Sequence, residues 1–251
     1  MGGKFVDNQV RALLESRLMK DQRPDAAPLA QVRPEKRPVT IESIRSEHRS
    51  RRELIGTRLS EFRAVWSEGT DEDLFAELVY CIFTAGASAK MGARAVEAIR
   101  PVLSTGPAIE LNERLLGVHR YPRARAGYVV VTRDFLTQDC RLRLRDRLSS
   151  FDDRDERRDW LARERGIKGL GYKESSHYLR NIGFSGYAIL DKHILRCLFE
   201  LEVIDSPKPP TTRGRYLAVE EKLRGFAHEI KIDFDELDLV LWSFKTGEVL
   251  K

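Results

Sequence analysis

The chain has 251 residues, of which 33% are charged and 41% are hydrophobic, and its formal net charge is +5. This length accommodates one large domain or two small lobes, and the modest basic excess suits a polyanionic partner or simply a solvated surface. No apolar run reaches the roughly 18–20 residues that a membrane span needs, and no signal peptide is visible, so we expect a cytoplasmic protein that does not enter a membrane.

Residues 1–40 differ in composition from the rest of the chain. Five apolar residues recur at helical spacing near the start, and four prolines then interrupt a polar stretch that cannot form one regular element. We interpret residues 1–40 as an N-terminal extension or linker, either a disordered arm or one with a short partner-binding helix. The residues concerned are Val6, Val10, Leu13, Leu14 and Leu18, followed by Pro24, Pro28, Pro34 and Pro38.

Helical periodicity begins at about residue 41. One or two arginine-rich helices are expected within residues 41–62, and another helix over residues 90–103. The clearest core helix covers residues 71–83, where apolar residues recur at a spacing of four, and Thr70 or Asp71 is its natural N-cap. These patterns predict a helical core in the first half of the chain.

The segment of residues 120–128 combines arginines with aromatic side chains. Such a mixture can hold phosphates and stack on bases, so Arg123 and Arg125 are candidate DNA contacts. Tyr121 and Tyr128 are equally consistent with aromatic residues of the core. Both interpretations stay open from the sequence.

Three consecutive valines at residues 129–131 would by themselves suit a strand. No partner strand can be identified elsewhere, so we expect helices over residues 128–135 and 142–148. Further helical patterns cover residues 216–230 and 234–244. The chain is therefore predicted to be all-α.

A Gly-Leu-Gly turn separates two helical patterns in the second half of the chain. The first helix covers residues 152–165, and its charges are expected to form a solvated face; the second covers residues 172–182. Gly169 and Gly171 allow a tight reversal, because glycine accepts positive φ, and the turn exposes backbone N–H groups that can hold a phosphate. A helix-hairpin-helix motif is thus predicted at about residues 155–183.

Two polar residues follow this hairpin at positions that suit catalysis. Lys173 lies two residues beyond Gly171, and Asp191 is the expected N-cap of the next helix. A neutral lysine amine is a nucleophile that can form a Schiff base, and a carboxylate can stabilise a neighbouring positive charge. A lone lysine is usually a surface residue, so the combination with Asp191 carries the hypothesis.

The cysteines and histidines do not indicate a metal centre. Cys81, Cys140 and Cys197 are far apart and cannot supply the four ligands of an iron–sulfur cluster. His177 and His193 lack metal-site spacing and are expected to form hydrogen bonds near the site or to phosphate. No metal and no organic cofactor are therefore expected.

The hairpin region resembles the helix-hairpin-helix DNA glycosylase superfamily. Residues 171–183 (GYKESSHYLRNIG) and 188–195 (AILDKHIL) are similar to the archaeal-type 8-oxoguanine DNA glycosylase/AP lyases, the second 8-oxoguanine glycosylase family. The resemblance covers roughly residues 41–251 and implies one glycosylase domain with two helical lobes. It departs from the family pattern at Gly86, where a polar amide is common.

The resemblance also implies the roles of individual residues. Lys173 and Asp191 would be catalytic, in excision of 8-oxoguanine and β-elimination at the abasic site. Trp242 and Lys251 would recognise the base, while Gly169, Gly171, Arg123, Arg125 and His193 would contact DNA. A monovalent cation can sit between the hairpin carbonyls and a phosphate. The expected partner is double-stranded DNA containing 8-oxoguanine, bound by a monomer.

Two alternative functions remain at this stage. One is a hairpin glycosylase for another oxidised base, such as a pyrimidine, although the commonest version carries the iron–sulfur cysteines that this chain lacks. The other is a non-catalytic hairpin module that only grips DNA phosphates. Such a module has no need of Lys173 and Asp191 at this spacing.

Overall fold

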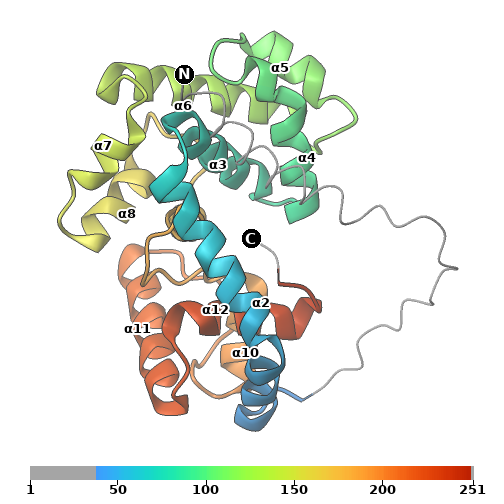
Figure 1. Ribbon diagram of the computed structural model, residues 1–251, viewed down its shortest axis with the longest axis vertical. Helices are drawn as coiled ribbons and strands as arrows, with labels where there is room; N and C mark the ends of the chain where they lie inside the picture. The colour runs from blue at the N-terminus through green and yellow to red at the C-terminus, as the bar shows by residue number, and fades with distance from the viewer. Residues whose placement is uncertain (1–37, 250–251) are drawn as a thin grey trace, which may run out of the picture. The chain divides into compact units, whose positions relative to one another are not determined.

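The computed structural model describes residues 38–249, and within them the chain forms helices and turns without a strand. The buried apolar residues gather in two clusters, which define two lobes (Figure 1). This confirms the predicted all-α, two-lobed fold. The predictions for residues 1–37 and for Lys251 lie outside the described residues. None of the helices within residues 38–249 is long and apolar enough to span a membrane.

Helix α2 (Ile41–Glu68) is shared by the two lobes. Thr40 caps it by accepting a hydrogen bond from the Ser43 N–H, and the helix continues unbroken where one or two helices were expected. Its first part buries Ile44, Ile55 and Phe62 in the second-lobe cluster. Its last turns place Val65 and Trp66 against the first-lobe cluster. Figure 1 shows α2 running from one lobe to the other.

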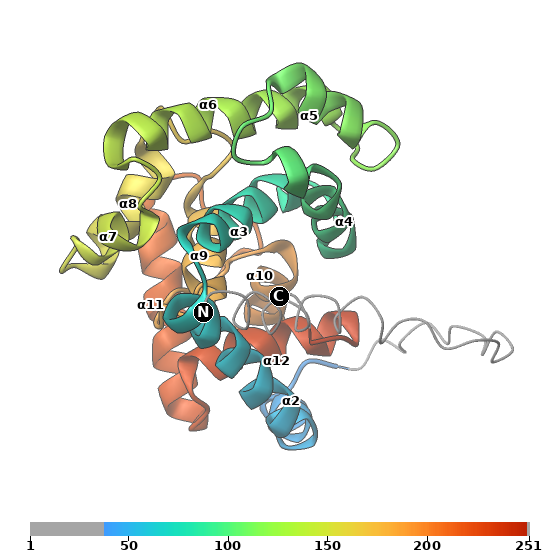
Figure 2. The same cartoon turned by 45° about the horizontal axis from the view of Figure 1, so that its top comes forward.

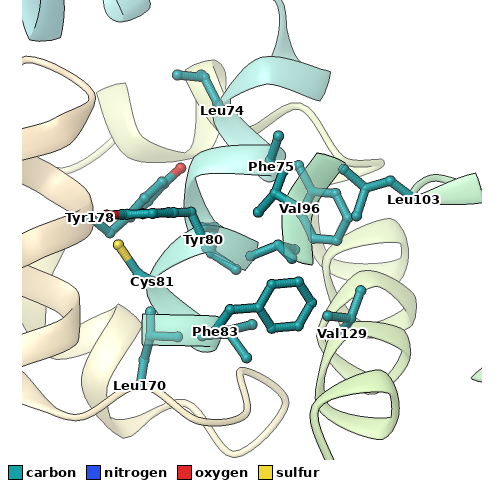
Figure 3. Packing of buried hydrophobic residues seen from close by; sticks show 14 of the residues in the cluster. Leu74, Phe75, Tyr80, Cys81, Phe83, Val96, Leu103, Val129, Leu170 and Tyr178 are labelled. Carbon is teal, nitrogen blue, oxygen red and sulfur yellow. The ribbon is translucent and has the colours of Figure 1, made fainter. Parts of the chain in front are cut away.

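The first lobe is organised around helix α3 (Asp71–Thr84), whose residues from Leu74 onward are all buried. Thr70 caps this helix, as predicted, by accepting from the Asp73 N–H. Figure 3 shows Phe83 of α3 directed toward Val129, with the hairpin residue Leu170 below the same helix. The helices around α3 are α4 (Ala89–Ile99), η1 (Arg100–Val102), α5 (Ala108–Leu115), α6 (Pro122–Cys140), α7 (Leu144–Ser149) and α8 (Arg154–Arg163).

The valine run belongs to a helix, as predicted, but this helix α6 begins at Pro122 and not at Tyr128. Proline is favoured at the first helical position, because its missing N–H would have no partner there and its φ is already helical. The aromatic and arginine segment after Tyr121 is therefore a helical surface and not a loop.

The second lobe contains α10 (Lys192–Glu200), α11 (Arg213–Ile230) and α12 (Phe234–Thr246), with the first part of α2 packed on α12. Helix α9 (Tyr172–Asn181), which follows the hairpin, has contacts with α8 and α3 in the first lobe and with α2. Figure 2 shows α9 between α3 and α10.

A buried ion pair connects α8 with α11. Arg158 is fully buried, and its Nη1 lies 2.5 Å from Oε2 of Glu220, while its Nη2 lies 2.7 Å from Oδ1 of Asp155. The expectation that the charges of this helix form a solvated face is therefore wrong for Arg158. A buried guanidinium must be paired, and its partner lies too far along the chain to be recognised from local spacing.

Candidate active site

The two hairpin glycines have different conformations. Gly169 has φ of +82°, whereas Gly171 is extended, with φ of −107° and ψ of −169°, and serves as the N-cap of α9. Only Gly169 therefore uses the left-handed region that was expected of this turn. A Cβ at Gly169 would lie 2.9 Å from Cδ2 of Tyr128, whereas one at Gly171 would meet only the Glu174 carboxylate at 3.5 Å.

Helix α6 is hydrogen-bonded to the backbone of the hairpin. The backbone N–H of Lys168 donates to Oγ1 of Thr132 over 2.9 Å, and Thr132 is fully buried. Leu170, between the two glycines, is buried in the first-lobe cluster. These contacts fix the turn against the core, so its backbone groups have a defined direction.

The two predicted arginine contacts have different environments. Arg125 is buried and donates from Nη2 to the Ala85 carbonyl, and its guanidinium lies over the Tyr128 ring, with Cζ 5.5 Å from the ring centre. Burial lowers the pKa of Arg125.

Arg123 is exposed and lines an open hollow of about 660 Å³ together with Tyr121, Tyr128 and Lys168. DNA contacts by either arginine stay a prediction, but Arg125 already holds the turn after α3.

Lys173 lies on the first turn of α9, directly after the hairpin. Its side chain is 28% exposed, and its Nζ is 3.4 Å from Oε1 of Glu174. The other oxygen of Glu174 accepts the Gly171 N–H over 3.3 Å, which completes a capping interaction. The amine is therefore partly shielded but still reachable from solvent, which suits a nucleophile.

Asp191 is the N-cap of α10, as predicted. Its Oδ1 accepts both the His193 N–H, over 2.7 Å, and the Ile194 N–H, over 2.9 Å. Both cap bonds use one oxygen, so Oδ2 takes no part in the cap. The His193 imidazole is half-buried, and burial lowers its pKa while Asp191 opposes that effect. His193 is thus favoured in its neutral form near Asp191.

Trp242 lies on α12 and is half-buried against the second-lobe cluster. It is therefore neither a fully buried core residue nor an exposed one. The base-recognition role of Trp242, like that of Lys251, stays a prediction.

The structure adds functional candidates that the sequence did not reveal. Asp238 is buried in α12 and accepts the Ile189 N–H over 3.2 Å, two residues before Asp191. Glu220 of α11 accepts the Ala188 N–H over 3.1 Å. For Asp238, the sequence offers only one signal, an acidic residue within the apolar run LDLVLW (residues 237–242). This signal does not indicate which residue Asp238 contacts.

Comparison with known proteins identifies the family. Residues 55–232 match the family described as 8-oxoguanine DNA glycosylase. A protein of Korarchaeum cryptofilum named 8-oxoguanine DNA glycosylase/AP lyase is 43% identical over 203 residues, which cover 80% of this chain and 91% of that protein.

Solved structures support the same conclusion. The Methanocaldococcus jannaschii 8-oxoguanine glycosylase/lyase in complex with a 15mer DNA containing 8-oxoguanine has a TM-score of 0.76 and 38% identity, covering 84% of this chain and 99% of that one. The Thermotoga maritima 8-oxoguanine DNA glycosylase has a TM-score of 0.75 and 37% identity, with coverage of 84% and 98%. This chain belongs to the 8-oxoguanine DNA glycosylase family. The family membership that the hairpin sequence of this glycosylase predicted is therefore confirmed.

The two hairpin glycines of the glycosylase provide a matched pair of substitutions. Gly169→Ala should lower the free energy of unfolding by about 1–2 kcal/mol, because alanine is strained at positive φ and its Cβ meets Tyr128. Gly171→Ala should cost less, because its extended conformation suits any residue. Urea unfolding of both variants measures the difference. An equal loss in the two would show that the positive φ of Gly169 is not what the turn requires.

Proposed function

We propose that this glycosylase excises 8-oxoguanine from double-stranded DNA and then cleaves the resulting abasic site. The observation that carries the proposal is the placement of Lys173 on the first turn after the hairpin, followed by Asp191 as the cap of α10. The relatives named above are described as glycosylase and AP lyase in one protein, which agrees with an amine nucleophile.

The proposed first step is attack by the neutral amine of Lys173 on C1′ of the damaged nucleotide. A new N–C1′ bond forms as the bond from C1′ to the base breaks, and the base leaves with the electron pair and takes up a proton. Opening of the sugar ring then gives a Schiff base between Lys173 and the sugar. Loss of a proton from C2′ allows β-elimination, in which the 3′ phosphate leaves and the strand is cut.

Asp191 would stabilise the positive charge that develops on the sugar as the base departs. A carboxylate held by two backbone N–H groups is fixed in place, so it needs no reorganisation during the reaction. Because both cap bonds use Oδ1, Oδ2 could face the sugar without loss of the cap.

The hairpin and its neighbours would hold the DNA backbone. Backbone N–H groups at a helix start favour phosphate, and Gly171, whose Cβ position meets only the Glu174 carboxylate, leaves room for its approach. Arg123 and Lys168, which line one hollow, would add side-chain contacts near the hairpin, and His193 would add a contact from the first turn of α10. A monovalent cation between hairpin carbonyls and phosphate is part of the same proposal. The enzyme would act as a monomer on chromosomal DNA in the cytoplasm, without another cofactor.

The flipped base would stack on Trp242 and be read by the chain end at Lys251. 8-Oxoguanine differs from guanine by an N–H donor at N7 and an oxygen at C8, so a terminal ammonium or carboxylate can distinguish the two bases. Enzymes that act on a base take it out of the duplex into such a pocket.

Borohydride trapping tests the nucleophile. Lys173→Gln should abolish the covalent adduct with 8-oxoguanine duplex, because glutamine cannot form a Schiff base. Lys192→Gln is the matched control, since Lys192 is exposed and adjoins Asp191 but lies on another helix. An adduct that persists in Lys173→Gln and disappears in the control would assign the reaction to a different amine.

Single-turnover excision tests the carboxylate. Asp191→Asn should slow excision by about 100-fold or more, because asparagine caps a helix nearly as well as aspartate but carries no charge. Asp153→Asn provides the control, because Asp153 caps α8 with the same pair of backbone bonds. Both variants should unfold at similar temperatures. Excision by Asp191→Asn at the rate of the control variant would make Asp191 only a cap.

The chain end is tested by removing Lys251 and measuring two substrates. Excision of 8-oxoguanine should fall by about 10- to 100-fold, the value of one hydrogen bond to a charged group, while cleavage of a ready-made abasic site stays near the parent rate. Lys251→Met removes the side-chain ammonium alone and should give the same selective loss if that group reads the base. Equal losses on the two substrates would mean that the terminus does not read the base.

A further inference from the structure

Buried side chains of α11 hold the backbone segment that leads to Asp191. The Tyr216 hydroxyl donates to the Ala188 carbonyl over 2.7 Å and accepts the Leu190 N–H over 3.4 Å. Glu220 accepts the Ala188 N–H, as described above. The backbone on both sides of Ile189 is therefore fixed against the second lobe.

Ile189 is the single residue that links Asp238 to Asp191 through hydrogen bonds of its backbone. Its N–H donates to Oδ1 of Asp238 over 3.2 Å, and its carbonyl accepts the Asp191 N–H over 2.7 Å. A displacement of the Asp238 carboxylate would thus be passed directly to the backbone of Asp191.

The same carboxylate is bound to the helix that carries Lys173. Oδ2 of Asp238 lies 3.1 Å from Nη1 of Arg180, which belongs to the last turn of α9, and both side chains are more than nine-tenths buried. The Arg180 guanidinium also lies over the Phe62 ring of α2, with Cζ 4.8 Å from its centre. One oxygen of Asp238 therefore contacts α9 and the other contacts the turn before Asp191.

We propose that Asp238 is a positioning residue that sets the Asp191 carboxylate relative to the helix bearing Lys173. The inference rests on the catalytic roles proposed above for these two residues. The proposed action on Asp191 runs through the Ile189 backbone, while the same carboxylate holds α9 through Arg180.

The apolar surroundings of Asp238 support a role beyond packing. Its neighbours Leu237, Leu239, Val240 and Leu241 are all buried, so an apolar residue would satisfy packing at this position. Burial raises the pKa of Asp238 to about 6, while Arg180 and the Ile189 N–H oppose that effect. Replacing a whole buried ion pair by apolar residues is often neutral or stabilising, although removing one partner is costly, so stability alone does not require a pair at this position.

Asp235 provides a matched control on the same helix. It also has a carboxylate whose pKa is raised by burial, and its Oδ1 accepts a backbone N–H, that of Gly186, over 2.8 Å. Within residues 38–249, Ile189 forms a backbone hydrogen bond with Asp191, whereas Gly186 forms none. Asp235→Asn and Asp238→Asn each remove one carboxylate charge from α12, but only the second change alters the partner of Arg180 and the acceptor of the Ile189 N–H.

The test is single-turnover excision of 8-oxoguanine by the full chain, with rate constant and amplitude read separately. Asp238→Asn should lower the rate constant by about 10- to 100-fold, because a displacement of about 1 Å costs this much. Amplitude and duplex affinity, measured at a temperature where both variants are folded, should match those of Asp235→Asn. The unfolding temperature of Asp238→Asn should be lower, because the buried Arg180 guanidinium loses its charged partner. A variant that is only less stable would lose amplitude and retain its rate constant.

A double variant determines whether Asp238 acts through Asp191. Asp191→Asn combined with Asp238→Asn should be no slower than Asp191→Asn alone, because the carboxylate to be positioned is already absent. If the two losses multiply, Asp238 acts independently and the inference is overturned. If Asp238→Asn does not fold, Asp238→Glu retains the charge but lengthens the side chain, and it should also lower the rate constant.

The outcomes separate this inference from the proposed function. A full rate constant in Asp238→Asn or Asp238→Glu, together with slow excision by Asp191→Asn, would overturn the positioning role alone. A full rate constant in Asp191→Asn would overturn the proposed role of Asp191, and the positioning role with it. Equal slowing by Asp235→Asn would show a general effect of charge loss on α12.

Discussion

The buried pair between Arg158 and Glu220 is the interaction on which the arrangement of this site depends. It joins α8, which precedes the hairpin, to α11 of the second lobe, and Glu220 also holds the Ala188 backbone. A fully buried guanidinium left without its partner costs about 3–5 kcal/mol, which is a large part of the stability of a typical domain. The hairpin and the segment before Asp191 are thus connected through one carboxylate.

Helix α9 is enclosed because small residues permit close approach on several sides. Ser175 and Ser176 are fully buried, and the Ser176 hydroxyl lies 3.3 Å from the Tyr216 hydroxyl of α11. At the other end of α9, a Cβ on Gly183 would come within 2.8 Å of the Arg63 Cα in α2, and this glycine has φ of +95°. A helix held at both ends in this way can present Lys173 from a rigid support, which is what a reacting group requires.

Local signals predicted most of the fold, whereas partners distant in the sequence could not be predicted. Thr70 and Asp191 were recognised as caps because capping depends on residues within one turn. The burial of Arg158 and the contacts of Asp238 depend on residues more than 40 positions away, and no periodicity encodes them. The DNA contact of Arg125 stays a prediction, but its bond to the Ala85 carbonyl could not be foreseen, because composition does not show which face of a helix a side chain occupies.

The continuity of α2 has a mechanical consequence for substrate recognition. Between its last second-lobe core residue, Phe62, and its first-lobe residues Val65 and Trp66, the helix contains neither glycine nor proline, the usual causes of a kink. Hinge closure of one lobe on the other would have to break backbone hydrogen bonds of this helix. On the proposed function, a protein connected in this way would bind by deforming the duplex more than by closing its lobes. Selectivity would then depend in part on how easily a given base pair yields to that deformation.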